Sequence, residues 1–115
     1  MRTILGAFDA YASKDFDRLA ELYAEDVTWC CRDEPGPWDC ESREDVFGMF
    51  RARMRRGMEA SIDEILVFGT KVLVRGHTKE HRFVNVFRVE DGRIVAVENQ
   101  PTTDAGLDAL KSKSA

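Results

Sequence analysis

Four polar side chains of this chain could do chemistry on a small molecule: Asp33, His81, Asn85 and Asn99. A carboxylate or an imidazole can take up and release a proton, and an amide can donate a hydrogen bond to an oxygen on which negative charge develops. Asn85 is the most informative of the four because it stands between two valines in a run where apolar residues alternate. An amide buried without a partner costs about 1–3 kcal/mol. We therefore expect Asn85 to find its partner inside a pocket.

Asp33 and His81 also have simpler interpretations. Asp33 precedes Glu34-Pro35-Gly36, a sequence that is typical of an exposed turn. His81 follows Lys79-Glu80 near the end of a predicted hairpin and could lie on the surface. Placed in a pocket, either side chain would be the candidate general base of an acid–base reaction.

The three cysteines do not form a recognisable metal site. Cys30 and Cys31 are neighbours on a predicted strand and point to opposite faces, and their spacing to Cys40 matches no zinc-ligand pattern. A nucleophilic cysteine would need a positioned base, for which only His77 or His81 is available. The sequence also has no phosphate-binding glycine loop and no dinucleotide fingerprint. We expect neither a metal nor a cofactor, and we interpret the cysteines as small core residues.

Helices dominate the first half of the predicted structure. The spacing of apolar residues predicts a helix over residues 2–13. Asp15 is the expected N-cap of a second helix, and Ser42 with Asp45 resembles the capping box of a third. A short β-favouring run over residues 27–31 predicts a strand between the second and third helices.

Strands dominate the second half. The predicted strands cover residues 62–68, 72–75, 81–89 and 93–100. Asp91-Gly92 between alternating apolar residues is the strongest hairpin signal in the chain. After Pro101 the tail is polar, and we expect Ala109-Leu110 and the Lys-Ser-Lys-Ser run that follows to fray. Helices followed by strands favour an α+β domain, with helices packed on one face of an antiparallel sheet.

Composition excludes several classes of protein. The chain has 115 residues, enough for one domain, and its 43% hydrophobic and 33% charged residues are ordinary for a soluble protein. A net charge of −4 argues against a nucleic-acid binder. Four arginines form a local basic cluster, which we interpret as the solvated end of a helix; they are Arg51, Arg53, Arg55 and Arg56. No apolar stretch is long enough to span a membrane, and Asp9 interrupts any signal peptide, so we expect a cytoplasmic protein.

The order of several short motifs resembles the nuclear transport factor 2-like superfamily. The motifs are Asp15-Phe16-Asp17, residues 23–29 followed by a Pro/Gly loop, Arg43-Glu44-Asp45-Val46, and residues 86–95 around the Asp-Gly turn. The chain is most similar to the small bacterial SnoaL-like and ketosteroid-isomerase-like members, over nearly all of residues 1–115. The resemblance implies a cystatin-like α+β roll, in which a curved mixed sheet packs on three helices as a cone. It also implies a mostly apolar pocket at the open end, and frequent homodimers.

The isomerase residues of that family carry over only in part. Its general base falls on Cys31, and a thiol is a poor substitute for a carboxylate base. Its oxyanion-hole aspartic acid falls on Asn85, whose amide can still donate a hydrogen bond. Its oxyanion-hole tyrosine falls on Ala7, with Tyr11 one helical turn further along. The resemblance therefore does not imply steroid isomerase activity for this chain.

Strand alternation predicts the walls of the pocket. If Cys31 faces inward, Trp29 and Asp33 do so as well, while Asn85 shares its face with neighbours on its own strand and on the last one. The predicted ligand-binding residues are Trp29, Cys31, Trp38, Asn85, Phe87, Val97 and Asn99. An aromatic wall with a few polar groups is the usual composition of a small-molecule site.

Two functions fit these residues. The first, slightly favoured because no carboxylate stands at the base position, is a non-catalytic domain that binds a small hydrophobic ligand or dimerises. Its homodimer would form through the outer sheet face around Val84 and Val86. The alternative is a cofactor-independent acid–base enzyme, an isomerase, dehydratase or hydrolase, with Asp33 or His81 as its base and Asn85 and Asn99 as polarising donors.

Overall fold

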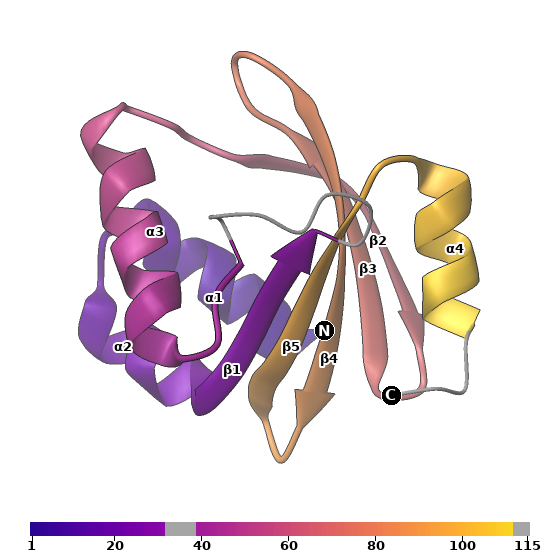
Figure 1. Cartoon of the computed structure of the whole chain (residues 1–115), viewed down its shortest axis with the longest axis horizontal. Coiled ribbons are helices and arrows are strands. Elements are labelled where there is room, and N and C mark those ends of the chain that lie inside the picture. The colour runs from indigo at the N-terminus through magenta and orange to yellow at the C-terminus, as the bar shows by residue number, and fades with distance from the viewer. Residues whose placement is uncertain (32–38, 112–115) are drawn as a thin grey trace.

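The structure is a computed structural model that describes residues 1–31 and 39–111, with only the backbone of Cys31. Within these residues the elements follow the order helix, helix, strand, helix, four strands, helix (Figure 1). Their bounds are α1 (Arg2–Ala12), α2 (Phe16–Leu22), β1 (Tyr23–Cys31), α3 (Arg43–Arg55), β2 (Ser61–Phe68), β3 (Lys71–His77), β4 (Arg82–Glu90), β5 (Arg93–Gln100) and α4 (Thr103–Lys111). The predicted α+β class is confirmed, and a helix that the sequence did not predict ends the described chain.

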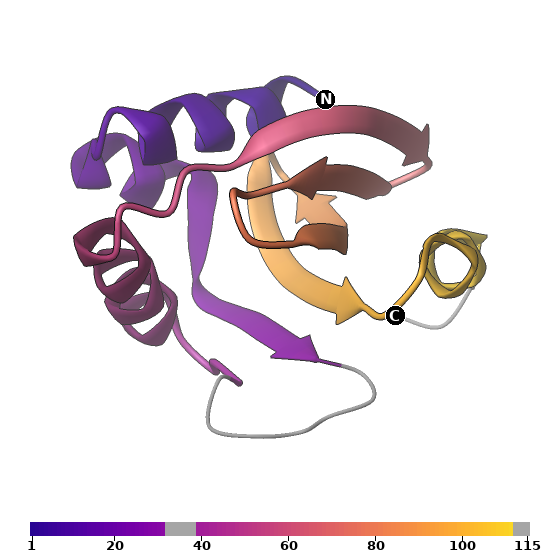
Figure 2. The same ribbon diagram turned by 90° about the horizontal axis from the view of Figure 1, so that it is seen from above.

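The five strands form one mixed sheet in the order β1-β5-β4-β3-β2. β1 pairs in parallel with β5, and every other neighbouring pair is antiparallel. The sheet is strongly curved and does not close on itself (Figure 2). Helices α1, α2 and α3 lie against one face of the sheet, and α4 lies against the other. The first three helices and the curved sheet together make the cone that the resemblance implied.

Local signals in the sequence begin and end the helices. The Asp15 carboxylate accepts a hydrogen bond from the backbone N–H of Arg18 at 3.1 Å, and the Ser42 hydroxyl accepts one from the N–H of Asp45 at 3.1 Å. Both caps satisfy a donor that a helix leaves unpaired in its first turn. Past the end of α3, Gly57 takes a φ of +69°, a left-handed conformation that favours glycine.

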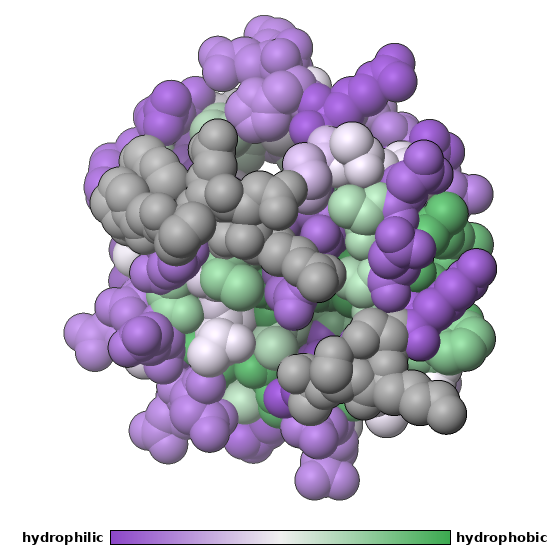
Figure 3. Space-filling view, turned by 45° about the vertical axis from the view of Figure 1, so that its right-hand side comes forward, coloured by the Kyte–Doolittle hydropathy of each residue, from purple (hydrophilic) through white to green (hydrophobic). Residues whose placement is uncertain are grey.

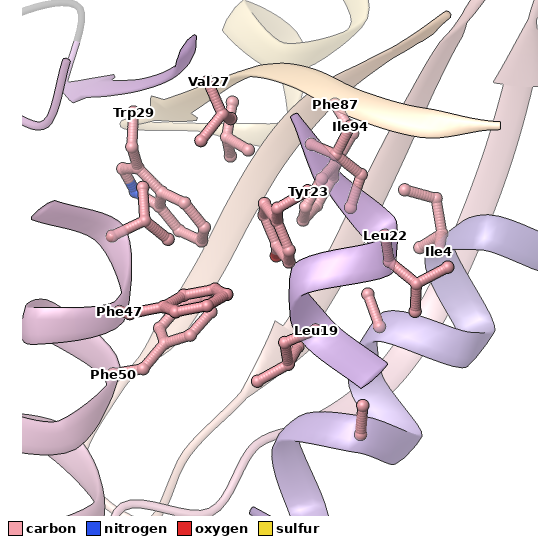
Figure 4. Close-up of a cluster of buried hydrophobic side chains, with 14 of the residues drawn as sticks. Ile4, Leu19, Leu22, Tyr23, Val27, Trp29, Phe47, Phe50, Phe87 and Ile94 are labelled. Carbon is pink, nitrogen blue, oxygen red and sulfur yellow. The ribbon is translucent and has the colours of Figure 1, made fainter. Parts of the chain in front are cut away.

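The main core lies between the sheet and the first three helices. Aromatic side chains from α3, β1 and β4 meet there edge to face, as Trp29 does with Phe50 at 5.7 Å and with Phe87 at 6.2 Å between ring centroids. Figure 4 shows these rings pointing toward one another from different elements. Edge-to-face pairs place the positive edge of one ring against the negative face of another. The core therefore joins α3 to the middle of the sheet through aromatic contacts.

The C-terminal segment forms helix α4, and the expectation of fraying is wrong for residues 109–111. Helix α4 covers the outer face of β3 and β4, where Ala109 and Leu110 pack with three strand residues. Those strand residues are Leu73, Val84 and Val86, all buried. Gly106 permits the close approach, since a Cβ at that position would lie 2.6 Å from Val84 Cγ1. Apolar side chains on the outer face of the sheet need a cover, and α4 provides it.

The hairpin between β4 and β5 combines a tight turn with a shift of register. Asp91 and Gly92 both take positive φ, +52° and +75°, as a type I′ turn requires. The register then shifts by one residue between Arg88 and Val89, and beyond the shift Asn85 pairs with Asn99 and Phe87 with Val97. The turn and this irregularity together place two amides directly opposite each other on the face that α1 and α3 cover.

Candidate functional site

A cavity of about 170 Å³ lies at one end of the main core. The exposed lining residues, which include Ala60, His81 and Arg82, mark the mouth of the cavity. They come from the segment after α3, from the turn that joins β3 to β4 and from the start of β4, which lie at the same end of the molecule (Figure 1). Its aromatic lining residues are Phe8, Tyr11, Tyr23, Trp29, Phe50, Phe83 and Phe87. Its other polar lining residues are Arg53, Thr78, His81, Arg82, Asn85, Asn99 and Gln100. The combination of many rings with a few polar groups is typical of a small-molecule site.

Asn85 and Asn99 form the polar part of the inner wall. They are cross-strand neighbours on β4 and β5, so their Cβ atoms lie about 5 Å apart. Asn85 is only 6% exposed, and its oxygen Oδ1 is fully buried with no hydrogen-bond partner among the residues that the structure describes. A buried carbonyl oxygen without a donor is costly and rare in folded proteins. A donor from outside the protein chain would satisfy it.

Arg53 places a positive charge beside these rings. Its guanidinium carbon lies 5.6 Å from the centroid of the Trp29 ring, a cation–π contact. It also acts on Tyr11 and Tyr23: burial raises the pKa of both phenols, most strongly for the fully buried Tyr23, and the charge of Arg53 opposes part of that rise. The interpretation of all four arginines as a solvated helix end is therefore wrong for Arg53, which lines the cavity.

The sequence identifies the family to which this chain belongs. A profile of the SnoaL-like domain matches residues 4–97. The chain belongs to the SnoaL-like domain family. No curated protein matches it.

Several solved structures have the same fold. A protein of Sinorhizobium meliloti described as a candidate polyketide cyclase is 24% identical, with a TM-score of 0.76 over 87% of this chain and 94% of that one. A loop-truncation variant of IdmH, from Streptomyces antibioticus, is 26% identical, with a TM-score of 0.72 over 95% of this chain and 97% of that one. An epoxide hydrolase of M. tuberculosis is 20% identical, with a TM-score of 0.69 over 95% of this chain and 82% of that one.

The structure brings four of the predicted site residues of this SnoaL-like domain to one cavity wall: Trp29, Asn85, Phe87 and Asn99. His81 lies one residue before β4, at the mouth, with its side chain exposed. Val97 does not line the cavity; it is fully buried in the core, opposite Phe87. Val97 lies on the inward face of β5, as strand alternation predicted, but further from the open end of the cone than Asn99.

Three further predicted residues cannot be placed at the cavity. Asp33 and Trp38 lie outside the described residues, so their roles stay predictions. The backbone of Cys31 pairs with Asn99 in the parallel ladder, and its side chain is not described. Ala7, which stands at the tyrosine position of the isomerases, lines the cavity, and so does Tyr11.

Residues 1–31 and 39–111 contain neither a cluster of metal-binding side chains nor a helix suited to span a membrane. No three side chains of His, Cys, Asp or Glu gather there as they would around a metal ion. Cys40 is buried, and burial raises the pKa of its thiol, so it stays protonated. None of the described helices is both long and apolar enough to cross a membrane.

The two tyrosines give this site a pH signature. Tyr11 and Tyr23 are the only tyrosines in the sequence, and burial raises the pKa of each above the ordinary value of about 10. The folded protein therefore holds both phenolic protons more tightly than the unfolded chain does. We expect stability to fall as the pH rises above about 10, because the unfolded chain loses these protons first. Titration of phenolate absorbance should show both phenols ionising later than in the urea-unfolded chain; ordinary titration of Tyr23 in the folded state would contradict the burial of its ring.

Proposed function

We propose that this SnoaL-like domain binds a small, ring-containing molecule in the cavity, with a polar group of the ligand hydrogen-bonded to Asn85. The observation that carries the proposal is the buried Oδ1 of Asn85, which has no partner among residues 1–31 and 39–111, in an aromatic-walled cavity. A hydroxyl or N–H of a ligand would donate to this oxygen and remove the cost of its burial. Asn99, opposite it, supplies a second amide to the same ligand.

The size of the cavity favours a ligand of one or two rings. An engineered cavity of about 150 Å³ with apolar walls holds benzene, and the cavity here is about 170 Å³. Trp29, Phe50 and Phe87 present ring faces and edges to that space. The mouth beside Met58 and His81 leaves room for a substituent to extend toward solvent.

Binding without catalysis is favoured over acid–base chemistry by the lining residues. No carboxylate is among the described residues that line the cavity. His81 is the one lining imidazole in residues 1–31 and 39–111, and it lies at the mouth, away from the buried amide wall. A general base must reach the proton that it removes, within about 3 Å or through one water. The catalytic alternative therefore depends on His81 or on Asp33, and its substrate would be of the same class.

The amide of Asn85 provides the test. Asn85→Leu removes the unpartnered oxygen at nearly constant volume, so we expect the free energy of unfolding to rise by about 1 kcal/mol or more. Phenol and toluene differ by one hydroxyl, and we expect the domain to prefer phenol. In the variant that preference should fall by about threefold to tenfold, the value of one neutral hydrogen bond. Chemical-shift titration gives the affinities, and urea unfolding gives the stability.

Val86→Ala is the matched control on the opposite face of the same strand. Val86 is buried under α4 and does not line the cavity, so its truncation should lower stability and leave the phenol preference unchanged. A loss of stability in Asn85→Leu with an unchanged preference would refute a binding role for the amide. Recovery of the ligand after incubation tests the catalytic alternative, because an enzyme would return a chemically altered molecule.

Dimerisation stays a separate prediction. The outer face that a homodimer would use is partly occupied, since α4 covers Val84 and Val86. Figure 3 brings the side that carries α4 forward, and apolar surface is visible there between polar side chains. Only the part of the outer face that α4 leaves open remains for a second copy.

A further inference from the structure

The charge of the cavity lining is opposite to the charge of the whole chain. The chain carries a net charge of −4. In contrast, the ionised side chains among the described lining residues are Arg53 and Arg82, and no described carboxylate faces the cavity. A cavity lined by one sign of charge with apolar walls concentrates ligands of the opposite sign.

Arg53 differs from the other arginines of its cluster. It is half-buried, lines the cavity and forms no salt bridge with any residue that the structure describes. Arg51, two residues earlier on α3, is exposed and lies 4.5 Å over the ring of Phe16, away from the cavity. Arg55 and Arg56 are exposed as well. Among the described residues of this cluster, Arg53 thus holds its charge against the rings that would contact a ligand, without a described carboxylate as a salt-bridge partner.

The surroundings of Arg53 strengthen its effect on a bound group. Trp29 covers one side of the guanidinium, and Tyr11 and Tyr23 are close enough for the charge to lower their pKa values against the effect of burial. A charge that is partly removed from water and lacks a counter-ion gains from one supplied by a ligand. The planar guanidinium matches a carboxylate in particular, because it can donate two parallel hydrogen bonds.

We propose that the ligand of this cavity is an aromatic anion, an aryl carboxylate in the first instance, whose charged group is bound by Arg53 at the mouth while its ring lies against Trp29 and Phe87. The proposal rests on the proposed binding function and names its ligand class. Arg82, exposed at the same mouth, adds a second positive charge that attracts the anion without enclosing it.

Matched pairs of probes separate charge from shape. Benzoate and benzamide have the same outline and differ in charge, as do 2-naphthoate and 2-naphthamide. We expect the anion to bind about tenfold or more tightly than the amide at low salt, the value of a charge-assisted hydrogen bond. Raising the salt concentration should lower the affinity for the anion and leave the affinity for the amide unchanged. Affinities are measured by chemical-shift titration or calorimetry on the full chain.

Variants on α3 assign the effect to one side chain. Arg53→Gln should lower benzoate affinity about tenfold and leave benzamide affinity nearly unchanged, whereas Arg55→Gln removes the same charge from the exposed end of the helix and should change neither. Arg53→Lys keeps the charge but loses the planar pair of donors, so we expect it to retain part of the preference for benzoate over benzamide. It replaces Arg53→Gln as the test if that variant proves poorly folded. Unfolding midpoints of all three variants establish that the fold is intact.

The outcomes distinguish this inference from the function on which it rests. If benzamide binds as tightly as benzoate, or Arg53→Gln keeps the full preference, the ligand is not held by charge and the inference is overturned while the binding function stands. If no member of either pair binds and the phenol preference is also absent, both are overturned.

Discussion

A chain that ends at Pro101 is expected to lose about 5 kcal/mol of its free energy of unfolding. The deletion removes Ala109 and Leu110 and uncovers the three buried residues of the outer face, Leu73, Val84 and Val86. Each fully buried Leu or Val side chain contributes about 1.5–3 kcal/mol. Because a domain of this size has a total stability of about 5–15 kcal/mol, the deletion removes a third of that stability or more. Urea unfolding of the two chains measures the difference directly.

Point variants of α4 distinguish docking of the helix from a general effect of the deletion. Leu110→Ala should cost about 2–5 kcal/mol because the side chain is buried. Asp108→Ala lies on the exposed side of the same helix, and its effect should stay within about 0.5 kcal/mol. Equal midpoints for the full and the shortened chain would mean that α4 is not docked in solution, and the expectation of a frayed tail would then be correct.

The sequence did contain a signal for α4, although not within the tail itself. The segment 103–111 is short, contains Gly106 and carries few large apolar side chains. Its own helical pattern of apolar residues is therefore weak. The strong signal lies in β4, where Val84, Val86 and Phe87 make an apolar run on both faces of one strand. A strand of that kind must be covered on both sides. Helices α1–α3 cover one side, and the chain after β5 had to supply the rest.

The predicted part of the site depended on strand alternation, which has a fixed period of two. Asn85 and Phe87 share a face by alternation alone, whereas Asn99 joins them because the register of the hairpin shifts by one residue between Arg88 and Val89. Arg53 was missed for a different reason. Its residue type suggested a solvent-exposed side chain, whereas its spacing from buried residues indicated the inward face of α3. It stands three residues after Phe50 and seven after Val46, both buried, and therefore lies on the inward stripe of α3. Asp33 and Trp38 stand on either side of a Pro/Gly segment without periodicity, so no spacing argument could place them.

Phe87→Ala is expected to have the second large effect, and a ligand should reverse part of it. Phe87 is 1% exposed and packs edge to face with Phe8 and Trp29, each at 6.2 Å between ring centroids. Truncation of such a ring costs about 3–5 kcal/mol, through lost burial and the space left behind. Since Phe87 also lines the cavity, that space becomes continuous with it. Thermal unfolding should therefore show a lower midpoint and a larger upward shift on addition of toluene than in the unchanged protein.

The size of that rescue tests whether the cavity and the core are one apolar space. Val74→Ala is the matched control, because Val74 is fully buried on the same face of the sheet and does not line the cavity. Its truncation should lower stability by a smaller amount, and toluene should raise its midpoint no more than it raises that of the unchanged protein. If toluene shifts the midpoints of both variants equally, the space left by the Phe87 ring is not part of the ligand site. If the shift is larger in Phe87→Ala alone, the ring of Phe87 occupies the place where the ring of a ligand can lie.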